Sequence, residues 1–291
     1  YSVTGPFTQG FVDEWHHTRM GEYTYACSDF KFKKGLVSAT KTSGHTLQIA
    51  DGLWLDKKFK AAMMKSIAQS ELDRKRFVYS DIGFILLQQV VEAVTGKTLD
   101  AYLVSEFYRP MGLEHTLFQP LNRYKKADIM PTAANDYLRR QDLCGYVHDE
   151  AAAFMGGVSG NAGLFSTAQE LGKIYQMILN EGELDGKRYL RPETCRIFTT
   201  EKSAVSHRGL GYDKPNLKDP KANACASSAP ASVYGHTGFT GTCAWVDPEN
   251  DLVYIFLSNR LCPDAWNGKL NSMKIRQAIQ EVIYQSLYTP E

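Results

Sequence analysis

The chain has 291 residues, 43% of them hydrophobic and 22% charged, so it is long enough to bury a core in one large domain or two modest ones. Its 33 basic and 32 acidic side chains give a formal net charge of +1, which argues against a nucleic-acid-binding protein with a basic face. The longest apolar runs, FILL at 84–87 and LVYIFL at 252–257, are far shorter than the roughly 18 residues that a membrane span needs.

Residues 1–57 show no clear period and are predicted to be irregular. Residues 58–72, KFKAAMMKSIAQSEL, predict a helix. Apolar residues then recur at helical spacing between 80 and 95, which predicts a second helix. The recurring positions are Ile82, Leu86, Val90 and Val94, and Gly96 is a plausible end of the helix. A further helix is predicted over TLDAYLVSEFY, ending before Pro110.

The polar stretch 119–150 predicts loops. In STAQELGKIYQMILNEG, Thr167 and Glu170 fit a capping box at the start of a helix. Pro192 suits the first turn of another short helix, and the proline-containing stretch 203–232 predicts a long loop.

Near the end of the chain, TCAWV and LVYIFL flank the turn signal DPEND, which predicts a β-hairpin. A final helix is predicted over MKIRQAIQEVIYQSL, with one apolar face formed by Ile275, Ile279, Val282 and Leu287. A helical lobe at about 58–200 and a sheet with a helix at about 233–291 give an α+β fold.

Two short motifs could carry chemistry. Tyr79, Ser80 and Asp81 stand at the start of the second helix; a phenol, with its reference pKa of about 10, acts as a base only where its phenolate is stabilised. Ser80 or Asp81 could equally cap that helix. In GHTGFTGT at 235–242 the glycines allow close approach to a ligand, but the segment also fits a strand end entering a hairpin.

No metal site is predicted. The six cysteines form no C-x-x-C pair and do not resemble a disulfide framework. His148, Asp149 and Glu150 are adjacent, and adjacent residues seldom converge on one ion without a distant third ligand, so we expect no metal site there. Three carboxylates of the hairpin turn are expected to be exposed to solvent: Asp247, Glu249 and Asp251.

The chain resembles the penicillin-binding serine hydrolases in the order of five features. These are YSD, GGVSGNAGLFSTAQEL, HTG, the hairpin and the closing helix. The resemblance is to the class C β-lactamase-like branch, which includes D,D-peptidases and esterases. It covers residues 75–120 and 145–287 and extends to VTGKTLDAY and RPMGLEHT. It implies an antiparallel sheet flanked by helices, with a helical lobe, and serine-based acyl transfer without a cofactor.

The same resemblance implies the roles of the site residues. Tyr79 would be the catalytic base. Asp81 stands where the family commonly has Asn and would orient the substrate or pair with the motif lysine. The resemblance also places residues 148–150 near the cleft, as a loop-ordering polar cluster. The backbone N–H of Phe239 would form half of an oxyanion hole. Substrate binding would fall to His236, where Lys is commonest, with Thr237 and Gly238.

The family's nucleophile belongs to a Ser-x-x-Lys motif upstream of the tyrosine, where one helical turn places both side chains on one face. The chain offers two such strings, one beginning at Ser28 and ending at Lys31, the other at Ser38 and Lys41. Neither continues into an apolar helix, so we expect neither to be the nucleophile. We expect the nucleophile helix and the first strands to lie before Tyr1, with residues 1–57 a variable insertion and 58–291 the β-lactamase-like domain.

Similar domains occur at the C-terminus of bacterial cell-wall glycosidases of the β-N-acetylhexosaminidase kind. The expected partners are therefore a small-molecule or peptidoglycan-peptide substrate and the missing N-terminal part or a fused glycosidase, in a periplasmic or extracytoplasmic location. The alternative is a non-catalytic accessory domain that binds peptidoglycan or positions the glycosidase.

Overall fold

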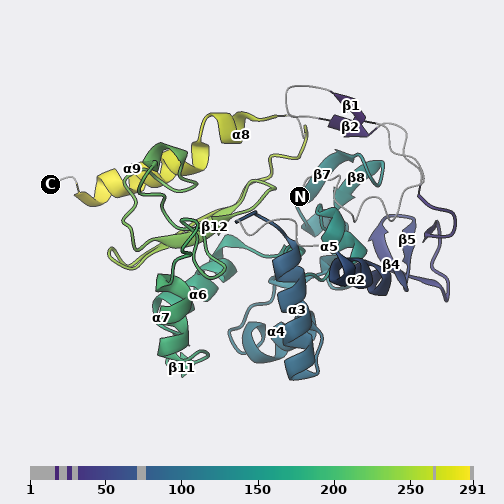
Figure 1. Cartoon of the computed structure of the whole chain (residues 1–291), viewed down its shortest axis with the longest axis horizontal. Coiled ribbons are helices and arrows are strands. Elements are labelled where there is room, and N and C mark those ends of the chain that lie inside the picture. Colours follow the sequence, from purple (N-terminus) through teal and green to yellow (C-terminus); the bar gives the residue numbers. More distant parts are fainter. Residues whose placement is uncertain (1–16, 20–24, 28–31, 71–76, 265–266, 289–291) are drawn as a thin grey trace. The chain divides into compact units, whose positions relative to one another are not determined.

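The computed structural model describes residues 17–19, 25–27, 32–70, 77–264 and 267–288 (Figure 1). The chain forms two compact units: the first comprises Tyr1–Leu103 and Leu117–Phe165, and the second comprises Val104–Thr116 and Ser166–Glu291. Residues 104–116 thus fold with the C-terminal half of the chain. Within the described residues, no helix is long and apolar enough to cross a bilayer.

The first unit mixes short antiparallel sheets with helices. β1 (His17–Arg19) pairs with β2 (Tyr25–Cys27), and β6 (Leu117–Phe118) pairs with β9 (Leu164–Phe165). Its helices are α2 (Phe59–Gln69), α3 (Ile82–Thr95), α4 (Leu99–Leu103) and α5 (Glu150–Phe154). Short 3₁₀ turns occupy Pro120–Asn122 and Lys126–Asp128. Its core contains Ile49, Leu55, Met63, Ile67, Ile85, Leu138 and Phe154.

Residues 37–56 form strands where the sequence predicted irregular structure. β3 (Val37–Ser38), β4 (His45–Ala50) and β5 (Leu53–Asp56) form a sheet in the order β3-β5-β4. The β4–β5 register shifts twice, between His45 and Leu47 and between Gln48 and Ala50. Such bulges interrupt the two-residue alternation by which a strand is recognised in a sequence.

Helix α3 forms as predicted, but most of its apolar repeat does not lie on its buried face. Leu86, Val90 and Val94 are 44%, 55% and 79% exposed, whereas Ile85 and Gln88 are buried. The helix ends at Gly96, which adopts the left-handed conformation common after helices. An apolar face of α3 therefore points to solvent.

The predicted loop region 119–150 contains a hairpin, β7 (Pro131–Asp136) with β8 (Gln141–Cys144). Asp136 and Arg139 form a fully buried ion pair of 2.7 Å at its turn. The guanidinium of Arg139 also donates to the carbonyl oxygens of Val147 at 2.9 Å and His148 at 2.6 Å. The pair thus fixes the segment that leads into α5.

The second unit begins with a π-helical turn, Val104–Tyr108, and continues with α6 (Ala168–Leu179) and α7 (Pro192–Thr200). A small hairpin of β10 (Glu183–Leu184) and β11 (Lys187–Arg188) separates these two helices. A long segment follows, with a 3₁₀ turn at Pro220–Ala222 and an isolated antiparallel bridge from Asp213 to Gly235. The chain then forms β12 (Tyr234–Thr237), β13 (Cys243–Asp247), β14 (Leu252–Phe256), α8 (Lys269–Ser272) and α9 (Ile275–Tyr288).

The antiparallel sheet β12-β13-β14 confirms the predicted hairpin, with Asp247 opposite Leu252 at its turn. Figure 1 shows α9 beside this sheet. The side chains of Trp245, Tyr254 and Tyr284 pack in a common core. The fully buried side chains of α9 are Gln280 and Tyr284. Three residues of its predicted apolar face are 38–62% exposed: Ile279, Val282 and Leu287.

Asp247 is also buried, contrary to the expectation that the carboxylates of this turn are exposed. It accepts hydrogen bonds from the backbone N–H of Glu249 at 2.9 Å and from Asn250 Nδ2 at 2.8 Å. Tyr284 of α9 donates its hydroxyl to the same carboxylate at 2.9 Å. Asp247 therefore shapes the turn and ties it to α9.

Glu170, in the first turn of α6, joins this helix to residues 114–116. Thr167 caps the helix by accepting from Glu170 N at 3.3 Å, as predicted. The Glu170 carboxylate, however, accepts from the backbone N–H groups of Glu114 and His115 at 2.9 and 3.0 Å and from Thr116 Oγ1 at 2.6 Å. Burial alone would raise the pKa of Glu170, but these hydrogen bonds lower it below its ordinary value.

Replacing Glu170 by Gln should reduce the free energy of unfolding at pH 7 by about 1–2 kcal/mol, since hydrogen bonds to an ionised group are lost. A folded-state pKa below the unfolded value of 4.5 adds stability that is present above pH 4.5 and disappears as the pH falls through the folded pKa. Urea unfolding between pH 3 and pH 7, roughly the range over which a carboxyl titrates, should show the variant and the wild type converging in acid. The exposed Glu201→Gln serves as control, and a pH-independent loss in Glu170→Gln would contradict the explanation.

Candidate functional site

In the first unit, Tyr79, Ser80 and Asp81 lie where α3 begins. The side chain of Tyr79 is 49% exposed, so it is not packed into hydrocarbon. Ser80 Oγ accepts from Ile82 N at 3.3 Å and thereby helps to cap the helix. Asp81 makes no side-chain capping hydrogen bond, so its carboxylate is not used by the helix.

Asp81 lies in an environment that disfavours its charge. Burial raises the pKa of this carboxyl group above its ordinary value, and the negative charge of Asp149 raises it further. Asp149 is itself fixed, because it caps α5 through Ala152 N at 2.7 Å and accepts from Asn161 Nδ2 at 3.0 Å. The predicted loop-ordering cluster at 148–150 therefore lies within electrostatic range of the Tyr79–Asp81 motif.

The glycine-rich segment 156–163 holds α3 in place. Gln88 accepts from Gly160 N at 3.2 Å and donates to Val158 O at 3.3 Å. A Cβ atom at Gly160 would lie 2.1 Å from the carbonyl oxygen of Phe84, closer than any real contact. Only glycine at position 160 allows segment 156–163 to lie this close to α3. This close packing fixes α3, the helix that begins after Asp81.

In the second unit, His236 and Thr237 end β12, opposite Ala244 and Cys243 of β13. The turn that follows is closed by a 2.7 Å hydrogen bond from Gly238 N to Thr242 O. Phe239 lies on this turn with its side chain 66% exposed. The predicted substrate-binding residues and Phe239 thus form one continuous segment, which we call the 236–242 turn.

The hydrogen bonds of His236 define its tautomer. Its Nε2 lies 3.1 Å from Arg208 NH1, and a guanidinium can only donate, so Nε2 accepts. Its Nδ1 lies 2.7 Å from the carbonyl oxygen of Thr237, which can only accept, so Nδ1 carries the proton. His236 is therefore neutral in this arrangement, and the cation beside it is Arg208, which also pairs with Asp213 at 3.3 Å.

Two further arginines hold the carbonyl groups of the 236–242 turn. Arg276 donates to Thr242 O at 2.9 Å and to Gly238 O at 3.4 Å. Arg260 donates from Nε to Phe239 O at 2.6 Å. None of the three arginines was predicted as a site residue. Arg208, Arg260 and Arg276 come from separate segments of the chain, and only the fold brings them to the turn.

The structure also places one of the two Ser-x-x-Lys strings. Ser38 lies in strand β3, and its Oγ accepts from Thr40 N at 3.3 Å. Lys41 lies over the ring of Trp54, 5.5 Å from its centre. Ser38 and Lys41 are therefore not on one helical turn. The string that begins at Ser28 lies outside the described residues.

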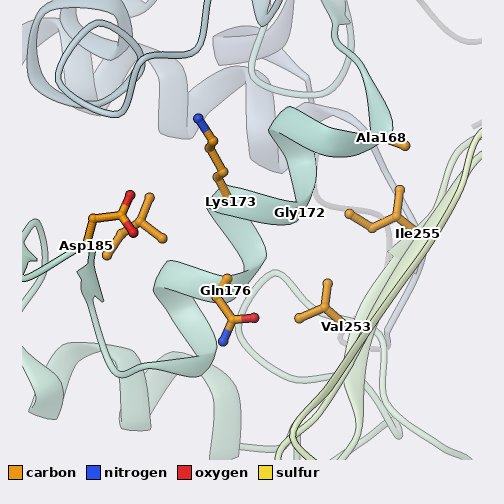
Figure 2. Close-up of a pocket in the computed structure, with 8 residues that line it drawn as sticks. Ala168, Gly172, Lys173, Gln176, Asp185, Val253 and Ile255 are labelled. Carbon is orange, nitrogen blue, oxygen red and sulfur yellow. The ribbon is translucent and has the colours of Figure 1, made fainter.

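A hollow in the second unit lies against α6 and β14 (Figure 2). It has a volume of about 470 Å³ and is lined by Ala168, Gly172, Lys173, Gln176, Leu184, Asp185, Val253 and Ile255. Figure 2 shows Val253 and Ile255 pointing toward α6. None of the predicted site residues lines it. In the described part of the chain, no cluster of His, Cys, Asp and Glu could hold a metal ion.

A protein-family model described as Beta-lactamase matches residues 39–271, which include both motifs. The chain belongs to the beta-lactamase family. The match begins within the segment 1–57 that was predicted to be an insertion. Membership in this family of serine hydrolases confirms the resemblance and the mixed α and antiparallel β fold inferred from the sequence.

Several curated relatives in this beta-lactamase family are similar to the chain. A protein of Escherichia coli (strain K12) named "Putative D-alanyl-D-alanine carboxypeptidase" is 34% identical over 267 residues, 87% of this chain and 61% of the relative. A protein of the same name from Salmonella gallinarum is 32% identical and covers 73% of this chain and 52% of its own length. The chain thus spans less than two thirds of the length of these relatives.

Among solved structures, unliganded simvastatin synthase (LovD) from Aspergillus terreus has a TM-score of 0.50 at 15% identity, covering 79% of this chain and 61% of that one. At this level of identity the likeness concerns the fold alone. Within this beta-lactamase fold, Tyr79 and Asp81 belong to the first unit, and the residues from His236 to Phe239 belong to the second.

Proposed function

We propose that the protein to which this chain belongs is a serine hydrolase that transfers acyl groups, with the D,D-peptidase or esterase reaction as its chemistry. The observation that carries the proposal is a family match over residues 39–271 that retains both the Tyr79–Asp81 motif and the His236–Gly238 motif. Cell-wall peptide is the substrate class suggested by the relatives' name, and an extracytoplasmic location follows from that substrate.

The proposed mechanism gives each motif a role. The Tyr79 phenolate accepts the proton of the serine hydroxyl while the serine oxygen bonds to the acyl carbon of the substrate. The Phe239 N–H donates to the developing oxyanion, and Thr237 and Gly238 contact the substrate. The leaving group departs with the proton from Tyr79. Water then attacks the acyl-enzyme by the reverse sequence and releases the acid.

Asp81, in the place of the family's Asn, is compatible with this scheme. Asn donates and accepts hydrogen bonds, whereas an ionised Asp only accepts. Burial and the charge of Asp149 raise the pKa of Asp81 above its ordinary value. Its carboxyl group makes no capping hydrogen bond to α3, so its oxygens can accept a hydrogen bond from the substrate. We therefore assign Asp81 a substrate-orienting role.

We further propose that the nucleophile lies on a segment outside residues 1–291, as the sequence analysis expected. Two helices carry unburied apolar faces, with Val94 of α3 at 79% and Val282 of α9 at 62% exposure. Large exposed apolar surfaces usually mark sites where another segment or partner packs. Ser38, in a strand, lacks the helical turn that the Ser-x-x-Lys chemistry needs.

The test is acylation by a fluorescent penicillin, followed by intact mass. We expect an adduct on the natural gene product extended upstream and none on residues 1–291. In the extended protein, Tyr79→Phe should slow acylation by roughly 10²- to 10⁴-fold. An adduct on Ser38 or Ser28 would overturn the assignment of the nucleophile. No adduct on either protein would overturn the hydrolase and favour a non-catalytic accessory domain of a cell-wall glycosidase.

A further inference from the structure

Asp213 is fixed both to strand β12 and to the segment that precedes it. Its backbone N–H donates to Gly235 O at 2.7 Å, and its carbonyl oxygen accepts from Gly235 N at 3.1 Å, which adds one bridge to β12. Its carboxylate is 6% exposed and lies 3.0 Å from His207 Nε2 and 3.3 Å from Arg208 NH2. Asp213 therefore anchors two consecutive side chains to the strand that carries His236.

Arg208 links this carboxylate to the imidazole of His236. Its NH2 pairs with Asp213, while its NH1 lies 3.1 Å from His236 Nε2. A guanidinium is planar and rigid, so an ion pair that holds NH2 also sets the direction in which NH1 donates. Because NH1 can only donate, Nε2 presents its lone pair and the ring proton of the neutral imidazole resides on Nδ1.

The position of that proton matters to the backbone of the 236–242 turn. His236 Nδ1 lies 2.7 Å from the carbonyl oxygen of Thr237. This carbonyl and the N–H of Gly238 belong to one planar peptide unit, and the N–H donates to Thr242 O at 2.7 Å. The peptide is therefore held at both ends. With the proton on Nε2 instead, two lone pairs would face each other across the same 2.7 Å, and the peptide would turn away.

We propose that Asp213 is a positioning residue of the candidate site. By holding Arg208 on Nε2, it keeps His236 in the Nδ1–H tautomer, which fixes the peptide between residues 237 and 238. This inference rests on the proposed function, because the next N–H along the chain is that of Phe239, which we assign to the oxyanion hole. Such a donor stabilises an oxyanion best when its direction is set before the reaction.

The first test reads the tautomer directly. Long-range ¹H–¹⁵N correlation spectra of the whole ¹⁵N-labelled chain distinguish the protonated from the unprotonated ring nitrogen, and His236→Gln identifies the resonances of this ring. At about pH 8, where an ordinary histidine is neutral, we expect Nδ1–H to exceed Nε2–H by at least roughly tenfold. Asp213→Asn and Arg208→Met should each lower this ratio roughly tenfold, the scale of one hydrogen bond to a charged group. Arg208→Lys keeps a donor and should retain part of the ratio.

The second readout is the turn itself. Asp213→Asn should speed hydrogen exchange at the Gly238 amide by at least roughly tenfold, because the peptide loses its hold at the carbonyl end. Glu181→Gln is the matched control, since Glu181 is a carboxylate of the same unit that pairs with Arg196, and both of these side chains are exposed. The control should change neither the tautomer ratio nor the exchange at Gly238.

In the protein extended upstream, Asp213→Asn should slow acylation by penicillin by at least roughly tenfold, a fraction of the effect of losing an oxyanion-hole donor outright. If Asp213→Asn does not fold, Arg208→Met and Arg208→Lys make the same comparison, because the side chain of Arg208 is 24% exposed.

Three results would overturn the proposal: a wild-type His236 that is mainly Nε2–H, a tautomer ratio that the variants leave unchanged, or a changed ratio without an effect on acylation by an active protein. A changed tautomer and a loosened turn in a protein that penicillin never acylates would support the positioning by Asp213 and reject only the serine chemistry.

Discussion

Replacing Arg139 by Met should lower the free energy of unfolding by about 3–5 kcal/mol, the cost of removing one partner from a buried ion pair. Both side chains of the pair are fully buried, and the guanidinium makes hydrogen bonds of 2.8 Å from Nε and 2.7 Å from NH2 to Asp136. The substitution would also leave the carbonyl oxygens of Val147 and His148 without their donor. Urea unfolding at pH 7 measures the loss.

Acid should reduce this loss. Burial alone raises the pKa of Asp136, and Arg139 reverses the effect and lowers it. In the wild type, the contribution of the pair to the free energy of unfolding is therefore fully present above the pKa that Asp136 has in the unfolded chain. It is lost as the pH falls through the lowered pKa of Asp136 in the folded protein. Without Arg139 the strongest lowering influences on the pKa of Asp136 are gone, so burial raises that pKa and protonating Asp136 in acid stabilises the variant.

Two controls accompany this prediction. The double variant Arg139→Met with Asp136→Leu should recover most of the stability, since no unpaired charge remains buried. Replacing the adjacent, exposed Arg140 by Met should change stability by less than about 1 kcal/mol. An Arg139→Met protein as stable as the Arg140→Met protein would show that the pair does not hold the 147–150 segment.

Gly160→Ala should cost about 3 kcal/mol, the upper range for overpacking, because the added methyl group meets main chain. The new Cβ would lie 2.1 Å from Phe84 O and 3.3 Å from Gln88 Cβ. Segment 156–163 must then move away from α3, which breaks the hydrogen bonds of Gln88 to Gly160 and Val158. Thermal and urea unfolding report the loss.

Gly83→Ala is the matched control on the same helix. A Cβ there meets nothing within 4 Å, and alanine is the better helix former, so this variant should gain up to about 1 kcal/mol. In the upstream-extended protein, Gly160→Ala should also slow acylation more than Gly83→Ala, because it displaces the start of the helix that follows Tyr79. Equal stability of the two variants would contradict the close packing of segment and helix.

The elements that could be predicted are those with local signals. The DPEND turn between two apolar runs predicted the β13–β14 hairpin, and Thr167 predicted the start of α6. The bulged strands β4 and β7 could not be recognised, because their register shifts break the alternation of side chains. The local spacing of apolar residues and the residues typical of turns and helix caps therefore predict many of the helices and the β13–β14 hairpin.

The buried faces of α3 and α9 could not be predicted from apolar spacing. Each helix buries a glutamine, Gln88 or Gln280, whose amide is satisfied by backbone groups far away in the sequence. The motifs Tyr79–Asp81 and His236–Gly238 could be found because each is contiguous. Arg208 and Arg260 could not, since their roles depend on contacts with the 236–242 turn that only the folded chain creates.

Strand β14 has a practical consequence for all the unfolding experiments above. It is the last strand of its sheet within the described residues, and its sequence Leu252–Phe256 contains no charge, proline or glycine. Such uncharged end strands template the pairing of one molecule with another. Refolding yield should therefore fall as protein concentration rises, and dilute samples will give the reversible curves that a free energy requires.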